Sequence, residues 1–478
     1  MNGATLYMSN LSIPKRLGLL GPRLINRECH DWSGWNCGFA AHADYASNQP
    51  LAIIACRTSG DVKKALNWAV SNSLPIRPRG GRHNYCGHSS CVKDGCIIDT
   101  SGLKKFKVDV KRQTARLGAG LTMLELTEGL NRYNFGIPYA TGASVGLAGF
   151  LLGGGVGVES RIWGLGSDHV LGFELIGPNT GGRARPRWID PKTDPDLYFA
   201  CLGSGGGNFG IVTEFEVRLQ QIKTVALVQA SWEWDQFESV VDSWQRNAPK
   251  ANPRLSTFLT LSADRTIRLQ GQFTDDTATE EYVRNLVRDL FAESPPDTLD
   301  VTIVPHSLAT RTFLRISPEA PRGWHNLIKQ QLFKSTSAFA DSPLPPEALS
   351  LLRHSLESHP VLHAAPSQIG MVQLLAGGGK VAEPPEHPTA TDHRKSLFIL
   401  QYNGYWTAPE DRRPVQCWTT GIRTSLLPWT SGAYINYVDD EIPEPDRQAT
   451  YFGADAPRLL QLKAAYDPKR VFSYPHGL

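Results

Sequence analysis

The placement of glycine constrains this chain more than any other feature of its sequence. Its 44 glycines include three dense stretches, RGGRH (79–83), GGGVG (153–157) and GSGGGNFG (203–210). Glycine lets a backbone adopt left-handed conformations and approach another group closely. None of the stretches is a phosphate loop ending in Lys and Ser or Thr, and none opens a helix after a strand as a dinucleotide fingerprint does. Together they predict exposed backbone N–H groups around a large ligand, such as a pyrophosphate.

Charge and composition exclude several classes of function. The 478 residues include 49 basic and 46 acidic ones, a net charge of +3, and 41% are hydrophobic. Because the basic residues are scattered, we expect neither nucleic acid nor a membrane as a partner. The uncharged run 133–158 is long enough to span a bilayer, but its glycines and Pro138 argue against a helix. The first twenty residues lack a signal-peptide pattern, which favours a cytoplasmic protein.

The order of predicted elements indicates an α+β protein. In the first half, short apolar strands alternate with helices that begin with capping pairs, Thr58 with Asp61 and Thr122 with Glu125. After residue 222, alternating strands and amphipathic helices predict an antiparallel sheet flanked by helices. Its strands are expected at 225–234, 256–274 (a hairpin) and 396–406, and its helices begin near Asp235 and Thr277. Residues 292–395 show no clear pattern, and a last helix is expected over 456–466.

The stretch RGGRHNYCGH (79–88) allows more than one chemical interpretation. His83, Cys86, His88, Cys91 and Cys96 could hold a metal ion, or the glycines could admit a large flat cofactor on which His83 acts. The spacing H-x2-C-x-H-x2-C-x4-C does not match the paired ligands of structural zinc sites, so we predict no metal here. A plain surface-loop histidine is the third interpretation.

Several motifs in a fixed order cover nearly the whole chain. They are RGGRHNYCG (79–87), CIIDTSGL (96–103), VGLAGFLLGGGVG (145–157), WGLGSDHVLGFEL (163–175), DLYFACLGSGGGNFGIVTEF (196–215), YINYVD (434–439) and YDPKRVF (466–472). This order resembles the berberine bridge enzyme-like flavoproteins of the vanillyl-alcohol oxidase superfamily. The resemblance implies a two-part FAD-binding domain of the PCMH type. Residues 1–222 would form it, the C-terminal segment 431–478 would return to it, and 223–430 would be an inserted substrate domain.

The resemblance also implies how FAD is held. The family histidine that bonds covalently to the 8α-methyl of the flavin corresponds to His83, although Arg82 replaces the glycine that precedes it in the family. Many relatives add a second link through the cysteine of G-x-C-P-T-V-G, but this chain reads ATGASVG (140–146), with Gly142 or Ala143 at that place. We therefore expect one covalent bond, through His83. The other implied cofactor contacts are Arg79, Gly80, Gly81, Arg82, Asn84, Gly142, Val145, Gly146, Gly149, Gly153, Gly154, Gly155, Gly157, Asn208, Gly210, Val212 and Asn436.

The catalytic residues that the resemblance implies are tyrosines. Tyr437, the second tyrosine of YINYVD, corresponds to the family base, and a lowered pKa would suit that role. Its alternative is an ordinary core tyrosine. Alternation in a strand would put Asn436 and Tyr437 on opposite faces, so a bend is needed if both reach the flavin. Tyr85 is expected to border the substrate. Gln401 and Tyr402 are expected there too, near Ile399, where some relatives carry a catalytic glutamate.

An oxidase is the function that these residues favour. Val145 matches the family pattern in which a valine, unlike a leucine, leaves oxygen room to reach the flavin. The expected reaction removes a proton and a hydride from a small molecule of the natural-product class, passes the hydride to flavin N5 and reduces oxygen to hydrogen peroxide. An alcohol oxidation or an oxidative cyclisation would fit. The alternatives are a flavin dehydrogenase with another acceptor and a non-redox cyclase on the same fold. Neither the substrate nor the oligomeric state is predicted.

Overall fold

The computed structural model describes residues 21–178, 183–317, 330–361 and 370–478. Its first half begins with a small sheet in the spatial order β1 (Arg23–Ile25), β2 (Ala52–Ala55), β4 (Cys96–Asp99) and β3 (Ile76–Arg79). The last three strands are parallel. Every residue of β4 is buried, as expected for a parallel strand covered on both faces. Helix α2 (Ser59–Ser71) follows β2 and begins with the predicted Thr58–Asp61 capping box.

A second, antiparallel sheet completes the first half. Its strands are, in spatial order, β5 (Phe106–Asp109), β6 (Thr114–Gly118), β10 (Ile211–Arg218), β8 (Val170–Pro178) and β9 (Ala184–Ile189). Two of the three glycine-rich stretches lie in the connections around this sheet. One follows helix α4 (Leu147–Leu152), and the other lies between helix α6 (Pro195–Cys201) and β10. Helix α3 (Met123–Asn131) begins with the predicted Thr122–Glu125 capping box.

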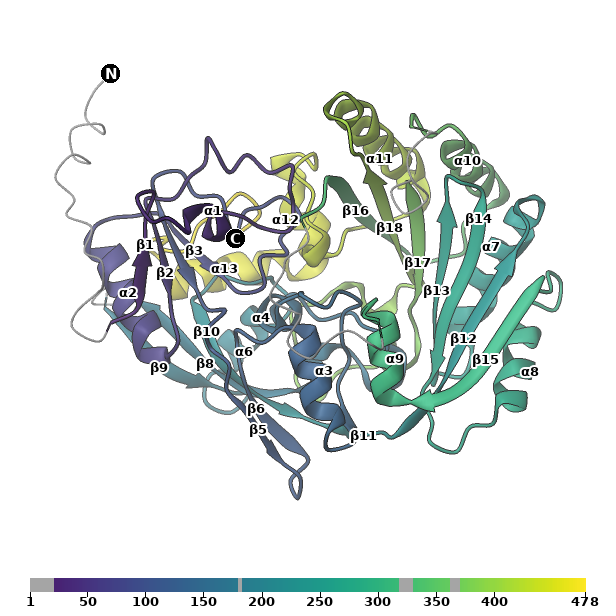
Figure 1. Cartoon of the computed structure of the whole chain (residues 1–478), viewed down its shortest axis with the longest axis horizontal. Coiled ribbons are helices and arrows are strands. Elements are labelled where there is room, and N and C mark those ends of the chain that lie inside the picture. Colours follow the sequence, from purple (N-terminus) through teal and green to yellow (C-terminus); the bar gives the residue numbers. More distant parts are fainter. Residues whose placement is uncertain (1–20, 179–182, 318–329, 362–369) are drawn as a thin grey trace.

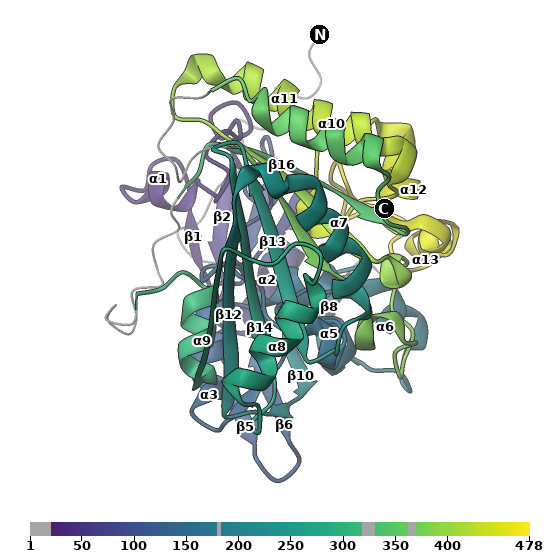
Figure 2. The same ribbon diagram turned by 90° about the vertical axis from the view of Figure 1, so that its right-hand side faces the viewer.

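The second half builds one seven-stranded antiparallel sheet, the large sheet. Its spatial order is β15 (Thr298–Pro305), β12 (Thr224–Trp232), β14 (Thr266–Phe273), β13 (Leu255–Ser262), β17 (Met371–Ala376), β18 (Phe398–Tyr405) and β16 (Phe333–Ala340). Four helices cover its outer face (Figure 1 and Figure 2): α7 (Phe237–Asn247), α8 (Glu280–Leu290), α10 (Pro346–Glu357) and α11 (Arg412–Leu426). The predicted mixture of helices and sheets is confirmed, and so is the antiparallel sheet with flanking helices.

The two faces of the large sheet belong to different cores. Leu259, Leu374 and Leu400 pack under the covering helices. The neighbouring residues in the strands, among them Phe258 and Ile399, join the core of the first half instead. Because successive side chains of a strand point to opposite faces, the large sheet turns one complete face towards the glycine-rich stretches.

The C-terminal segment returns to the first half. Helices α12 (Glu444–Phe452) and α13 (Ala456–Tyr466) lie beside the elements of the first half in Figure 1. The buried ammonium group of Lys463 fixes this contact. It donates to the backbone oxygen of Asn208 at 2.5 Å, to the backbone oxygen of Phe472 at 2.6 Å and to the carboxylate of Asp467 at 2.7 Å.

Two expectations about local structure need correction. The helix expected from Thr277 begins at Glu280, with Thr279 as its N-cap. The unassigned region 292–395 contains β15, helix α9 (His306–Phe313), β16, α10 and β17. β16 gave no signal because its sequence, FKSTSAFA, is buried along its whole length and therefore lacks the alternation of a half-exposed strand.

Candidate active site

The loop after β3 and the segment 142–146 approach each other at two glycines. A Cβ atom on Gly81 would lie 2.2 Å from the backbone nitrogen of Gly146, and one on Gly146 would lie 2.4 Å from that of Gly81. No side chain fits at such distances, which explains why both positions are glycine. We call the loops 79–83, 142–146, 153–157 and 203–210 the glycine loops. The predicted cofactor contact Gly80 is adjacent, where a Cβ would meet Thr100 at an ordinary 3.7 Å.

Two arginines anchor the first glycine loop from behind. Arg79 and Asp99 form a fully buried ion pair with Nε and Oδ2 2.6 Å apart. Arg82 has a left-handed backbone (φ +62°), and its guanidinium group stacks over Trp35 at 5.1 Å and lies 3.5 Å from Asp99. Both side chains therefore hold the loop in place. Asn84 holds the following turn in place, because its side-chain oxygen accepts hydrogen bonds from the backbone nitrogens of Cys86 and His88 at 3.1 and 3.0 Å.

His83 lies half-buried between the first two glycine loops. Its Nε2 is 2.8 Å from the hydroxyl of Ser144, and its ring stacks on Phe39 at a centroid distance of 4.3 Å. Burial lowers the pKa of His83 to about 4, so the imidazole is neutral at physiological pH. Sequence reasoning missed both neighbours, because Phe39 belongs to no motif and Ser144 was considered only as part of the segment that lacks a cysteine.

Tyr85 and Tyr437 form a parallel stack. Their ring centroids are 5.5 Å apart and their planes differ by 1°. The hydroxyl of Tyr85 accepts a hydrogen bond from Nε2 of Gln401 at 3.3 Å, and the edge of Phe333 meets its ring. Burial raises the pKa of both tyrosines, and neighbouring phenols add to the effect on each. A lowered pKa, which would suit a base, is therefore not what this environment produces.

The segment that carries Tyr437 is a short 3-10 turn, η11 (Ile435–Tyr437), and not a strand. The turn lets Asn436 and Tyr437 serve different neighbours. Asn436 donates to the hydroxyl of Tyr434 at 2.9 Å, and a Cβ on Gly153 would lie 2.2 Å from Asn436 Oδ1. The hydroxyl of Tyr434 in turn accepts from the backbone nitrogens of Gly155 and Val156, both at 3.1 Å. This segment therefore fixes the 153–157 loop.

The remaining glycines of that loop shape its backbone. Gly154 and Gly155 have φ values of +100° and +81°, which L-residues rarely adopt. A Cβ on Gly157 would lie 2.5 Å from the backbone oxygen of Tyr139. Gly149 differs from these, because a Cβ there would meet nothing within 4 Å.

The 203–210 loop is built mainly by its own hydrogen bonds. Asn208 is buried, donates to the backbone oxygen of Ser204 at 2.8 Å and accepts from the backbone nitrogen of Leu478 at 3.0 Å. A Cβ on Gly210 would crowd Leu175 and the backbone of Ile176, and Val212 lies within the core of the first half. These three predicted contacts thus pack the loop against its surroundings.

The structure separates Tyr402 from Gln401. Gln401 points to the face of the large sheet that meets Tyr85, while the neighbouring Tyr402 is fully buried with Leu400 under the covering helices. The expectation that both residues border the substrate is corrected for Tyr402 by strand alternation. Ile399 shares the face of Gln401.

Val145 lies in the chain between Ser144, which contacts His83, and Gly146, which contacts Gly81. Its side chain is half-buried against the core of the first half. Its backbone nitrogen donates to Gly142 at 3.1 Å, and its backbone oxygen accepts from Met123 at 2.9 Å. A Cβ on Gly142 would lie 2.9 Å from a methyl group of Val145. The bend of this segment therefore fixes the position of the valine.

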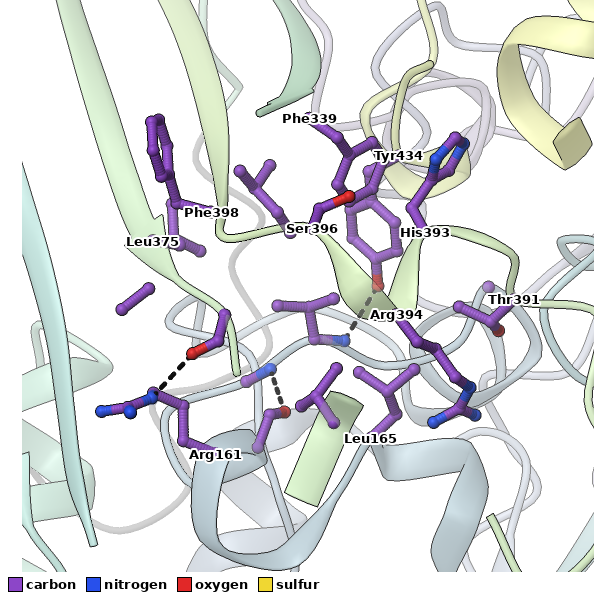
Figure 3. Close-up of a pocket in the computed structure, with 18 of the residues that line it drawn as sticks. Arg161, Leu165, Phe339, Leu375, Thr391, His393, Arg394, Ser396, Phe398 and Tyr434 are labelled. Atoms are coloured by element: carbon purple, nitrogen blue, oxygen red, sulfur yellow. Dashed lines mark hydrogen bonds between the residues drawn. The ribbon is translucent and has the colours of Figure 1, made fainter. Parts of the chain in front are cut away.

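A pocket lies between the glycine loops and the large sheet (Figure 3). Gly153, Val156, Gly157 and Gly203 contribute backbone to it, and the opposite wall is apolar, with Phe258, Phe339, Leu375 and Ile399. Its two arginines are already paired. Arg394 forms an ion pair with Asp168 at 2.6 Å, and Arg161 donates to the backbone oxygens of Pro249, Ala251, Leu255 and Gly377.

The residues of this region fit a dinucleotide such as FAD. The glycine loops leave out side chains where the backbones meet, and Gly154, Gly155, Gly203, Gly205 and Gly207 hold left-handed conformations that bring bare backbone to the surface of the loops. Two buried polar atoms in the pocket lining, Thr391 Oγ1 and His393 Nε2, have no hydrogen-bond partner among the described residues. Such atoms are suited to a polar ligand.

None of the helices in the described part of the chain is long and apolar enough to cross a membrane.

Comparison with known proteins agrees with this arrangement. The family model described as FAD binding domain matches residues 50–182, and the one described as Berberine and berberine like matches residues 433–478. The first segment contains His83 and Tyr85, and the second contains Tyr437. The chain is 33% identical to FAD-linked oxidoreductase YgaK of Bacillus subtilis over 431 aligned residues. The alignment covers 90% of this chain and 91% of the relative.

Solved structures share the fold at lower identity. BBE-like 1 of Physcomitrella patens superposes with a TM-score of 0.83 at 24% identity, covering 95% of this chain and 96% of that one. The grass pollen allergen Phl p 4, described as having glucose dehydrogenase activity, gives 0.83 at 20% identity and 97% coverage of each chain. Its isoleucine-to-valine variant, described as a glucose oxidase, gives 0.83 at 21% identity and the same coverage.

Proposed function

The chain belongs to the berberine bridge enzyme-like family of FAD-linked oxidoreductases, and from this premise we propose that it oxidises a small organic molecule and passes the electrons to molecular oxygen. The observation that carries the proposal is the convergence of Tyr85, Tyr437 and Gln401 beside the glycine loops. When bound, FAD supplies the acceptor for the hydride that leaves the substrate. The protein has to bind the cofactor, orient the substrate and move one proton.

FAD is held through His83 alone. A neutral imidazole is a suitable nucleophile, and the hydrogen bond of Nε2 to Ser144 leaves Nδ1 as the nitrogen with no protein partner among the described residues. The segment 140–146 has no cysteine for a second link. The backbones of the glycine loops and the side chain of Asn436 complete the binding site.

This linkage is testable without a substrate. The protein is denatured in acid, and the flavin is followed to the pellet or the supernatant. We expect a yellow pellet, a flavin-modified peptide that contains His83, and loss of both in His83→Ala. Flavin that remains in the supernatant would contradict the covalent bond, and a flavin-modified cysteine would contradict attachment through His83 alone.

Tyr437 is the principal base in this proposal. It is the tyrosine in the segment that also carries Asn436, so one short turn would place both the base and a cofactor contact. Tyr85 stacks on it and orients it, and Gln401 holds the hydroxyl of Tyr85. Since burial raises the pKa of Tyr437, its phenol is protonated at rest, and its basic form has to be stabilised by contacts that form with the substrate.

Oxygen is the acceptor that Val145 favours. A valine lacks one methylene relative to leucine, and packed interiors transmit such differences in volume. The grass pollen pair supports the idea that a single aliphatic residue matters on this fold, because an isoleucine-to-valine change accompanies the change from a described glucose dehydrogenase to a described glucose oxidase. A dehydrogenase with another acceptor and a non-redox cyclase are the competing functions.

A screen for hydrogen peroxide release from a mixed library of natural products tests the proposal. The apolar wall formed by Phe258, Phe339, Leu375 and Ile399 favours substrates with a flat or apolar body. Every compound that the protein converts, with or without release of peroxide, is then added without air, and air is admitted once any change in the flavin absorbance is complete. Rapid return of the absorbance is expected of an oxidase. Slow return would favour the dehydrogenase, and a flavin that never bleaches with a converted substrate would favour the cyclase.

A further inference from the structure

A second cluster of reactive side chains lies apart from the flavin-binding residues, where the loop after His83 meets the C-terminal segment. Its members are Cys86, His88, Asp440 and His476. Nε2 of His88 is 2.9 Å from Oδ1 of Asp440 and 3.0 Å from Nδ1 of His476. Nδ1 of His476 is 3.5 Å from the same carboxylate oxygen, and the thiol of Cys86 lies within 4.8 Å of both the His88 nitrogen and the Asp440 oxygen.

The hydrogen bonds around the cluster orient His476 towards its centre. The other ring nitrogen of His476, Nε2, is 3.1 Å from the backbone oxygen of Asp439. A carbonyl oxygen only accepts, so Nε2 carries the hydrogen and Nδ1 of the neutral ring offers a lone pair. A histidine held in this way by a backbone carbonyl is the usual arrangement of a metal ligand.

From this geometry we propose that Cys86, His88, Asp440 and His476 bind one Zn²⁺ ion. Four ligands at zinc bond lengths of about 2.0–2.1 Å for nitrogen and oxygen stand about 3.3 Å apart at the corners of a tetrahedron. The three nitrogen and oxygen atoms are 2.9, 3.0 and 3.5 Å apart, so shifts of a few tenths of an ångström would fit these three to the ion. The thiol of Cys86 now donates to the backbone oxygen of Val438 at 3.3 Å, and it would have to turn from that oxygen towards the ion. The mixed thiolate, imidazole and carboxylate set suits zinc better than magnesium or calcium, which prefer oxygen ligands.

The surroundings allow such an ion to enter and to stay. Asp440 is 53% exposed and His88 14% exposed, while His476 is fully buried, so the cluster opens to solvent on one side only. Asn84 sets the turn that carries Cys86 and His88. Arg447 donates to the backbone oxygens of Asp440 and Pro475 and thereby joins the two segments that carry the other ligands. Binding replaces the thiol proton of Cys86, which leaves to solvent.

At this position the ion would link two functional loops, the one that carries His83 and the one that carries Tyr437. Cys86 follows His83 by three residues, and Asp440 follows Tyr437 by three residues. One ion would therefore fix the loop of the proposed flavin attachment against the loop of the proposed base. The spacing within RGGRHNYCGH could not predict this site, because half of the ligands come from more than 350 residues further along the chain.

Zinc content and affinity test the proposal without any turnover. The purified holoprotein is dialysed and analysed for metal, and a chelator-treated sample is titrated with zinc sulfate in a calorimeter. We expect one zinc per chain, and at least a tenfold loss of affinity in His88→Gln and in Cys86→Ser. Cys91→Ser and His354→Gln remove the same chemical groups elsewhere and should bind zinc as the parent does. X-ray absorption of the zinc-loaded protein should show one sulfur ligand at about 2.3 Å.

Two results would overturn the zinc site. One is a titration without heat and a metal content at background in the folded, flavin-loaded parent. The other is equal zinc affinity in the parent and in His88→Gln, which would mean that zinc binds elsewhere. His88 is partly exposed, so this variant should fold even where Cys86→Ser does not, and circular dichroism with flavin absorbance checks that it has. In either case the group would be only the hydrogen-bonded network Asp440, His88 and His476.

Discussion

The glycine loops and the large sheet position their functional groups in opposite ways. In the loops the backbone itself is the functional surface, and the contact of Gly81 with Gly146 leaves no room for one added carbon. In the large sheet the backbone is regular, and the alternation of side chains along a strand decides which face each residue joins. Gln401 therefore meets Tyr85, while Tyr402 lies under the helices. The loops should therefore be intolerant of an added side chain where their backbones meet, whereas the sheet should be sensitive only on one face.

The largest effect is expected for Gly81→Ala. Its Cβ would lie 2.2 Å from one backbone atom of Gly146 and 2.6 Å from another, and backbone cannot move aside as a flexible side chain can. We expect a loss of about 3 kcal/mol or more in the free energy of unfolding, at or above the usual range for overpacking, together with loss of bound flavin. Urea denaturation and flavin absorbance measure the two effects.

Gly421→Ala is the matched control for that substitution. Gly421 lies within α11, where an added Cβ would meet nothing within 4 Å. Alanine should therefore stabilise the helix by about 0.5–1 kcal/mol. If both variants change stability alike, the contrast between the loops and the covering helices of the sheet is wrong.

The second effect concerns two tyrosines that the sequence places together at the site. Tyr437→Phe should slow flavin reduction by about 10²–10⁴-fold, the range for loss of a positioned base, with flavin still bound. Tyr402→Phe should leave the rate unchanged, because the Tyr402 hydroxyl is buried without a hydrogen-bond partner among the described residues. Anaerobic stopped-flow absorbance gives both rates. A normal rate in Tyr437→Phe would shift the role to Tyr85.

The third effect is a dependence on pH. Burial raises the pKa of Tyr437 and of Tyr85, and a base acts in its deprotonated form. As long as the pH is below the pKa, that form becomes about tenfold more abundant for each unit by which the pH rises, so the rate of flavin reduction at low substrate should increase through the neutral and mildly alkaline range. The slope should vanish in Tyr437→Phe. A parent rate that is flat across this range would rule out a high-pKa phenol as the base.

The smallest effect is expected at Val145, where a glycine loop carries a side chain with a proposed role. Val145→Leu adds one methylene and should slow reoxidation of the reduced flavin by about tenfold, or about 1.4 kcal/mol in the barrier, with little change in reduction by substrate. Val145→Ala should reoxidise at least as fast as the parent. Stopped-flow absorbance of each half-reaction separates the two steps. Equal reoxidation in all three proteins would place the oxygen path elsewhere.

Local signals allowed much of the fold to be predicted from the sequence. The capping pairs at Thr58 and Thr122 and the apolar stripe of α7 depend on neighbouring residues, and the structure has them as expected. β16 could not be found, because a strand buried on both faces has no periodic pattern. For 435–437 the sequence indicated only that a bend is needed if Asn436 and Tyr437 both reach the flavin. The shape of the turn could not be predicted, because it depends on Tyr434 reaching the glycine loop far away in the sequence.

The candidate site was predictable where a motif carries it and unpredictable where tertiary contacts do. RGGRHNY and YINYVD indicated His83, Tyr85 and Tyr437, and the structure brings the two tyrosines together. Phe39 lies against His83 from a segment with no motif. The choice between Gln401 and Tyr402 depends on which face of β18 meets the first half, and both faces of this strand are buried, so the strand alone does not decide it.

The hydrogen bonds that hold the glycine loops in shape also determine when, during translation, these loops can fold. Arg161, just after the 153–157 loop, needs the backbone of Gly377, while Gly155 needs the hydroxyl of Tyr434 and Asn208 is held by Lys463. The ribosome makes these partners hundreds of residues after the loops themselves. The loops therefore reach their final shape only when the chain is almost complete, and loading of the cofactor is a late event that a truncated or stalled chain cannot undergo.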